Sequence, residues 1–165
     1  MRKQSLLILI VAVLFSFQTS LGQKRLGVVC GDPTAACKAH MDNFQPADLP
    51  FDQGKNLVIY ESQPFYGIIL KSVKLADWGD CANPTFKEPD RAALQALFEH
   101  NKVFMQNCVE SGSYYYTGVA DKTALVAVYA GRTLAEANKF LKTVQALNKF
   151  AGARVRKMRV SVNGT

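Results

Sequence analysis

The sequence has few of the residues on which metal centres and nucleophilic catalysis depend. Its 165 residues include two His, four Cys and one Trp. Neither His40 nor His100 stands in a recognisable motif, and no Cys-x-x-Cys or His-x-x-x-His spacing occurs, so we expect no cofactor and no catalytic nucleophile. A metal set of Cys30, Cys37 and His40 is the remaining alternative, and its spacing is not typical of a zinc site.

Acidic residues are also scarce, with 13 Asp and Glu against 20 Lys and Arg, which gives a net charge of +7. Asp77 and Asp80 form an acidic pair on either side of Trp78. General acid–base catalysis needs a positioned pair of titratable groups, but a polar loop explains this pair equally well. The sequence therefore favours a protein that is not an enzyme.

No apolar run reaches the roughly 20 residues that a membrane-spanning helix needs. The shorter apolar run Leu6–Phe17 follows Arg2 and Lys3, as in a secretory signal peptide. We expect a signal peptide over residues 1–22, and hence a secreted or periplasmic protein with no membrane span after cleavage. An uncleaved N-terminal anchor is the alternative.

All four cysteines follow the predicted signal peptide. An even number in an oxidising compartment predicts two disulfides, and the spacing alone allows three connectivities. We favour Cys30–Cys37, which would close a short turn, together with Cys81–Cys108.

The elements expected from hydrophobic periodicity begin after an extended lead-in over residues 23–56, which would hold the first disulfide. Residues 57–165 then form a single α+β domain. A capping box at Thr133 and Glu136 marks the clearest helix start. The predicted strands are 57–61, 65–75, 102–107, 114–119, 124–130 and 153–162, and the predicted helices are 88–100 and 133–148.

The core of this order is β-α-β-β-α-β, the split βαβ arrangement. It predicts a four-stranded antiparallel sheet with two helices on one face. The first two core strands would then end at the same edge of the sheet, which is why we pair Cys81 with Cys108. The other face of the sheet would be open to a ligand.

Four residues are the candidates for ligand binding on that open face, because aromatic and basic side chains suit a glycan or a nucleic acid. The predicted secretion disfavours nucleic acid. As an alternative, Phe104 and Tyr129 would pack under the lead-in, and the run Tyr114–Tyr116 would be an ordinary aromatic strand. The candidates are Lys71, Tyr129, Arg154 and Arg156.

Positive charge is concentrated at the end of the chain. From Arg132 onward, Glu136 is the one acid among eight Lys and Arg residues, whereas the rest of the predicted mature chain has slightly more acids than bases. Binding to an anionic partner would explain this asymmetry. A solvent-exposed helix face, followed by an edge strand whose Lys and Arg residues oppose pairing with other strands, would explain it as well.

The segments 125–131, 133–137 and 153–156 resemble a SPOR domain, with a Val-rich strand, a helix that opens on Glu-Ala and a following strand. The pattern covers residues 125–156. It departs from the family at Ala127, where a Gln is frequent, and at Gly131 or Arg132, where a Phe is usual. The resemblance implies the βαββαβ fold and binding to peptidoglycan glycan strands.

The sequence thus predicts a non-catalytic binding module, secreted or periplasmic, for peptidoglycan glycan strands or another anionic polymer of the cell envelope. The alternative is a protein-interaction or inhibitor domain of the same fold, with a secreted protein as its partner.

Overall fold

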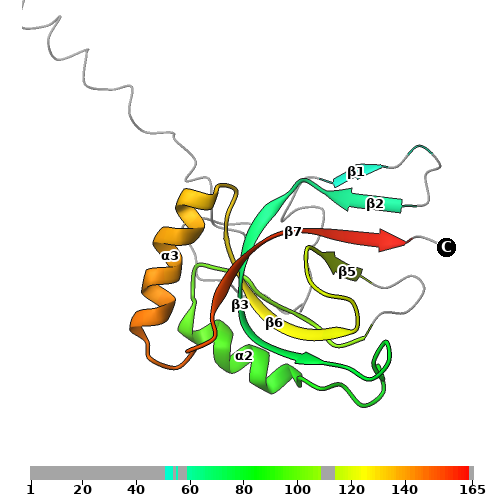
Figure 1. Cartoon of the computed structure of the whole chain (residues 1–165), viewed down its shortest axis with the longest axis horizontal. Coiled ribbons are helices and arrows are strands. Elements are labelled where there is room, and N and C mark those ends of the chain that lie inside the picture. Colours follow the sequence, from blue (N-terminus) through cyan, green and yellow to red (C-terminus); the bar gives the residue numbers. More distant parts are fainter. Residues whose placement is uncertain (1–50, 54, 56–58, 109–113, 164–165) are drawn as a thin grey trace, which may run out of the picture.

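The computed structural model of the chain describes residues 51–53, 55, 59–108 and 114–163 (Figure 1). The predicted signal peptide, most of the lead-in and the proposed Cys30–Cys37 bridge lie outside these residues. The elements are β1 (Phe51–Gln53), β2 (Ile59–Ser62), β3 (Phe65–Lys74), α2 (Glu88–Leu97), β4 (Val103–Gln106), β5 (Tyr114–Thr117), β6 (Thr123–Gly131), α3 (Leu134–Ala146) and β7 (Arg154–Asn163).

The seven strands form one antiparallel sheet in the order β1-β2-β7-β3-β6-β4, with β5 paired to β7. The prediction of a four-stranded sheet with two helices on one face is therefore wrong. The difference begins in β7, which continues beyond its partner β3. Its residues 154–158 pair with β3, and its later residues pair with β2 on one side and β5 on the other.

This extra pairing curls the sheet into a half-barrel (Figure 1). The face expected to be open is folded inward and forms a core of its own, which we call the inner cluster. Phe104 lies at its centre, with its ring centroid 5.9 Å from that of Phe65 and 4.7 Å from that of Tyr116. The buried members of the inner cluster are Phe65, Ile69, Phe104, Tyr116, Leu125, Ala127, Tyr129, Met158 and Val160.

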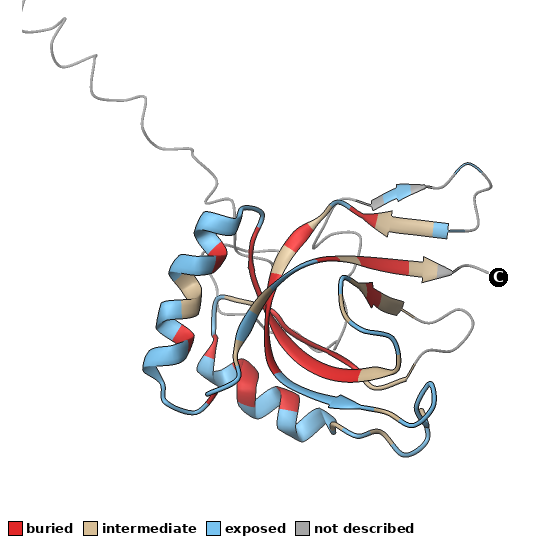
Figure 2. Cartoon of the chain, viewed as in Figure 1, coloured by how far each residue is buried: buried red, intermediate tan, exposed pale blue. Residues whose placement is uncertain are grey.

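Both helices pack against the outside of the curl, over a second core that we call the outer cluster (Figure 2). Alternation along β6 supplies both cores, since Leu125 and Ala127 face inward whereas Val126 and Val128 face the helices. A strand that is buried on both faces has a continuous run of apolar residues, and the sequence of β6 contains such a run. The outer cluster also includes Leu94, Phe98, Ala137, Val144 and Phe150.

The outer edge of β4 is covered by side chains of α2. The amide N–H of Val103 donates to Gln95 Oε1 at 2.9 Å, and Arg91 Nη1 donates to the carbonyl oxygen of Val103 at 3.2 Å. Arg91 is only 2% exposed and also forms an ion pair with Glu88. These polar side chains stand where a further strand would otherwise pair. They form hydrogen bonds with backbone groups of β4 that would be unpaired at the edge of the sheet.

The capping box predicted at the start of α3 is confirmed. The hydroxyl of Thr133 accepts from the amide of Glu136 at 3.2 Å, and Glu136 Oε2 accepts from the amides of Thr133 and Arg132 at 2.9 and 3.0 Å. Desolvation raises the pKa of Glu136, but these hydrogen bonds outweigh it and leave the pKa below its ordinary value.

Candidate functional site

The curled sheet does not bring the four predicted ligand residues to one surface. Tyr129 belongs to the inner cluster, is 1% exposed and packs against Phe65 with ring centroids 5.8 Å apart. Burial raises the pKa of its hydroxyl. Tyr129 is therefore a core residue, and its ring is not accessible to a polymer at the surface. Of the two interpretations of Tyr129 from the sequence, the structure agrees with a packed side chain, and its described neighbours belong to the inner cluster.

Lys71 is exposed, but a β-bulge moves it to the other face of the sheet. Ile69 pairs with Ala127, and both side chains belong to the inner cluster. Lys71 pairs with Val126, whose side chain belongs to the outer cluster and faces the helices. The register shift between Ile69 and Lys71 inserts one residue and so exchanges the two faces. Simple alternation from the sequence could not locate this shift.

Arg154 and Arg156 do lie together, on an exposed part of β7 that we call the basic stretch, Arg154–Lys157 (Figure 2). Arg154 Nη2 donates to the hydroxyl of Ser72 at 3.1 Å. Among the described residues, no acid forms an ion pair with the basic stretch. Arg159 differs, because Glu61 lies 3.7 Å from its guanidinium.

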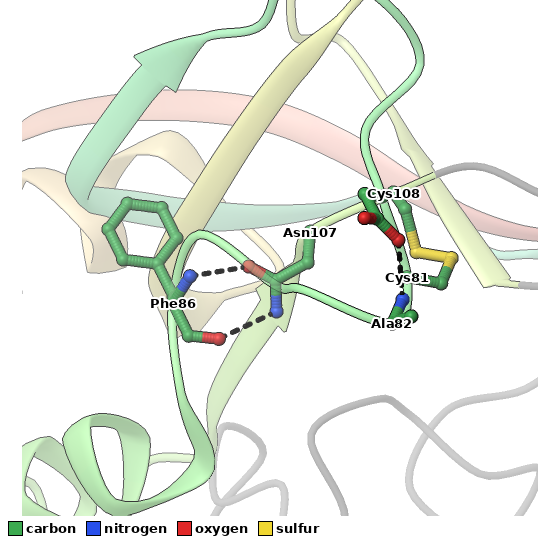
Figure 3. Close-up of a disulfide and its surroundings, with 6 residues drawn as sticks. Cys81, Ala82, Phe86, Asn107 and Cys108 are labelled. Carbon is green, nitrogen blue, oxygen red and sulfur yellow. Dashed lines mark hydrogen bonds between the residues drawn. A yellow bond between two sulfur atoms is a disulfide. The ribbon is translucent and has the colours of Figure 1, made fainter.

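The Cys81–Cys108 disulfide is present, as predicted, with 5.4 Å between the Cα atoms (Figure 3). It joins the loop after β3 to the end of β4. Asn107 adds two hydrogen bonds to the same loop, since its Oδ1 accepts from the amide of Phe86 at 2.7 Å and its Nδ2 donates to the carbonyl oxygen of Phe86 at 2.9 Å. The loop that contains Trp78 is thus fixed on β4 by covalent and polar contacts.

A pocket of about 290 Å³ opens beside this loop, and we call it the aromatic pocket. Three separate segments of the chain contribute to it: the loop after β3, the end of β4, and the stretch from β5 to the start of β6. Its lining residues are Trp78, Gln106, Tyr115, Tyr116, Val119, Ala120, Asp121 and Lys122.

Two glycines bring the walls of the aromatic pocket close to the sheet. Gly79 has a φ of +89°, and a Cβ there would lie 2.4 Å from the carbonyl oxygen of Asn107. Gly118 has a φ of +82°, and a Cβ there would lie 2.1 Å from the carbonyl oxygen of Lys157. Only glycine permits both the positive φ and the close approach, so both walls are fixed by their backbone.

The two walls also contact each other. The amide of Leu75 donates to the carbonyl oxygen of Lys122 at 2.7 Å, and Lys122 Nζ lies 5.7 Å from the centroid of the Trp78 ring. Asp77 approaches the same ammonium group at 4.0 Å. At the floor, Gln106 Oε1 accepts from the amide of Tyr116 at 2.8 Å and its Nε2 donates to the carbonyl oxygen of Thr123 at 3.1 Å.

Comparison with known proteins identifies no relative. No protein-family model matches the sequence, and neither a curated protein nor a solved structure is similar enough to be counted as a match.

The acidic pair beside Trp78 forms hydrogen bonds within its own loop. Asp80 Oδ1 accepts from the amide of Ala82 and its Oδ2 from the side-chain amide of Asn83, each at 2.8 Å. The Asn83 bond is the main reason that the pKa of Asp80 lies below its ordinary value. A carboxyl group held ionised in this way is poorly suited to act as a general acid.

Within the described residues, no three His, Cys, Asp or Glu side chains are grouped so that they could hold a metal ion. In the same part of the chain, no helix combines the length and the hydrophobicity that crossing a membrane would require.

Proposed function

We propose that the protein is a secreted or periplasmic, non-catalytic binding module that holds an anionic polymer of the cell envelope along the basic stretch. Peptidoglycan glycan strands, which the resemblance to SPOR domains implies, are the first candidate. The observation that carries this proposal is the group of exposed, neighbouring cations at Arg154, Arg156 and Lys157, which no described acid neutralises.

The surroundings of the basic stretch support contact with an extended chain. Among the described strands, residues 154–157 pair with β3 alone, so their other side is a sheet edge as far as Lys157, whose carbonyl oxygen Gly118 approaches closely. Lys74 at the end of β3 is exposed as well, two residues from Ser72, which accepts the bond from Arg154. Lys71 is exposed on the other face of the sheet and is not part of this surface. A line of like charges attracts a polyanion over several repeat units, and salt weakens that attraction.

The compartment is part of the proposal. The Cys81–Cys108 disulfide is typical of a protein that folds in an oxidising environment, and the predicted signal peptide leads to the same compartment.

Retention on purified peptidoglycan sacculi and on an anionic cell-wall polymer tests the proposal. We expect Arg154→Ala/Arg156→Ala to lose most retention at moderate salt. The matched control is Lys139→Ala/Lys142→Ala, which removes the same charge from exposed positions of α3 and should keep most retention. Equal losses in both variants would mean a general charge effect and would contradict a site on β7.

A second candidate is a protein-interaction or inhibitor domain, and one observation favours it. The edge of β7 at residues 154–157 is able to accept a strand from a partner protein. Lys and Arg on an edge strand normally oppose such pairing. Retention of one secreted protein without retention on any polymer would favour this alternative over polymer binding.

A further inference from the structure

The aromatic pocket is lined by no residue of the basic stretch, and it combines features of a small-molecule site. We propose that it is a second binding site, which takes one pyranose ring of gluco configuration stacked on Trp78. The inference goes beyond the proposed function, because the pocket would bind a free sugar whether or not the basic stretch holds a polymer.

One wall of the aromatic pocket is fixed and exposes a large aromatic ring. Trp78 is 48% exposed and belongs to neither core cluster, so the indole contributes little to folding where it lies. The disulfide between Cys81 and Cys108 and the close approach of Gly79 hold its loop in place. An aromatic ring that is held in position and left accessible loses little entropy on binding, which favours affinity.

The groups around that ring are a mixture of aromatic and charged side chains. A gluco-configured pyranose in a β-linkage has only equatorial substituents, so it presents flat C–H faces and an edge of hydroxyl groups. Trp78 and Tyr115 offer aromatic surface to such a face. The carboxylate of Asp121 is able to accept hydrogen bonds from the hydroxyl edge, and the ammonium group of Lys122 is able to donate them.

The size of the pocket supports a single ring. Its volume of about 290 Å³ is at the lower limit of the range for small-molecule sites. Gln106 already uses its side-chain amide to join Tyr116 to Thr123, so it shapes the floor and leaves the polar contacts to Asp121 and Lys122. An aromatic side chain of a peptide would use the stacking surface but would form no hydrogen bonds with Asp121 and Lys122.

Trp78 is the single tryptophan of the chain and therefore reports directly on the pocket. We would titrate the purified, oxidised protein with cellobiose and with chitobiose and follow tryptophan fluorescence. The expected result is a saturable change with a dissociation constant in the millimolar range, as is usual for a ligand of this size that makes few contacts.

Two pocket variants and one control, followed by calorimetry, complete the test. Trp78→Ala should bind about tenfold more weakly and Asp121→Asn about threefold more weakly. Leu134→Ala removes another exposed apolar side chain, at the start of α3, and should bind as the unmodified protein does. Circular dichroism would show that each variant folds.

Three results would overturn the inference: no fluorescence change with either disaccharide, undiminished sugar binding by Trp78→Ala, or a change produced only by an aromatic ligand such as N-acetyltyrosinamide. The Arg154→Ala/Arg156→Ala variant separates the two proposals. It should bind the disaccharides normally while losing retention on the polymer, and a loss of both would contradict two independent sites.

Discussion

Along β7, Arg154–Lys157 and Met158–Val162 belong to one strand but have different surroundings. Among the described strands, the first half pairs with β3 alone and is largely exposed. In the second half Met158 still pairs with β3, residues 159–162 pair with β5 and β2 joins from Ser161 onward, and this half is buried or half-buried. Arg156 and Met158 occupy the same face of the strand, two residues apart. Both pair with β3, Arg156 opposite Gly67 and Met158 opposite Phe65, but only Met158 belongs to the inner cluster, where the sheet closes. Burial here therefore follows the curl of the sheet.

The largest expected effect comes from the buried half. Met158→Ala should lower the free energy of unfolding by about 4 kcal/mol, because it leaves a cavity in the inner cluster, where Met158 is 1% exposed. Urea unfolding measures the loss. Arg156→Ala, on the same face in the exposed half, should change the stability by no more than about 0.5 kcal/mol. Similar losses in the two variants would contradict the contrast between the halves.

A second change tests whether both halves unfold as one unit. Replacing Cys81 and Cys108 by Ala removes a crosslink between residues 27 apart and should lower the free energy of unfolding by about 3 kcal/mol. Because the bridge lies on the loop after β3 and on β4, away from β7, we expect amide exchange to accelerate in both halves alike. Acceleration in one half only would divide the sheet into two units.

A smaller effect should be confined to the buried half. Gln106→Leu removes the acceptor of the Tyr116 amide and should cost about 2 kcal/mol, because a buried donor loses its partner. Since β5 pairs with residues 159–162 of β7, amide exchange should accelerate there and remain unchanged at residues 154–158. Uniform acceleration would show that Gln106 does not act through β5.

The smallest effect concerns the helix that leads into the exposed half. Thr133→Ala should cost about 1 kcal/mol through the loss of the N-cap. The pKa of Glu136 is lower in the folded protein than in the unfolded chain, so its contribution is present above the unfolded pKa and is lost as the pH falls through the folded pKa.

Thermal unfolding between neutral pH and about pH 3 measures this contribution. Glu136→Gln should weaken the dependence on pH in that window. Glu99→Gln removes an exposed carboxylate outside the cap and should leave the dependence unchanged. Identical curves for Glu136→Gln and the unmodified protein would contradict the role of the cap.

Short-range sequence patterns predicted most of the helices and strands, but they did not predict how these elements pack together. The capping box, both helices and the Cys81–Cys108 bridge follow from residues that are close in sequence or end at the same edge of the sheet. The bulge after Ile69 left no such signal, because an inserted residue changes the register without changing the apolar character of the strand. Lys71 and Tyr129 were assigned to one face for this reason.

The aromatic pocket illustrates the same limit for a site. Trp78 and the run Tyr114–Tyr116 are visible in the sequence as unusual aromatic residues, but they are far apart along the chain. Their meeting depends on the disulfide, on two close glycine contacts and on the closure of β5 toward β4 through Gln106. No local pattern encodes such a combination of distant contacts.

Within residues 57–165, the sequence by itself determined which segments are helices and strands, where α3 begins and that the last part of the chain is basic, because periodicity, capping and charge act over a few residues. It did not predict β1, which falls in the segment expected to be an extended lead-in. Only the tertiary structure decided which face of the sheet is closed. That choice depends on β7 pairing with three strands at once, and the free energy gained by burying the inner cluster favours the curl over an open sheet.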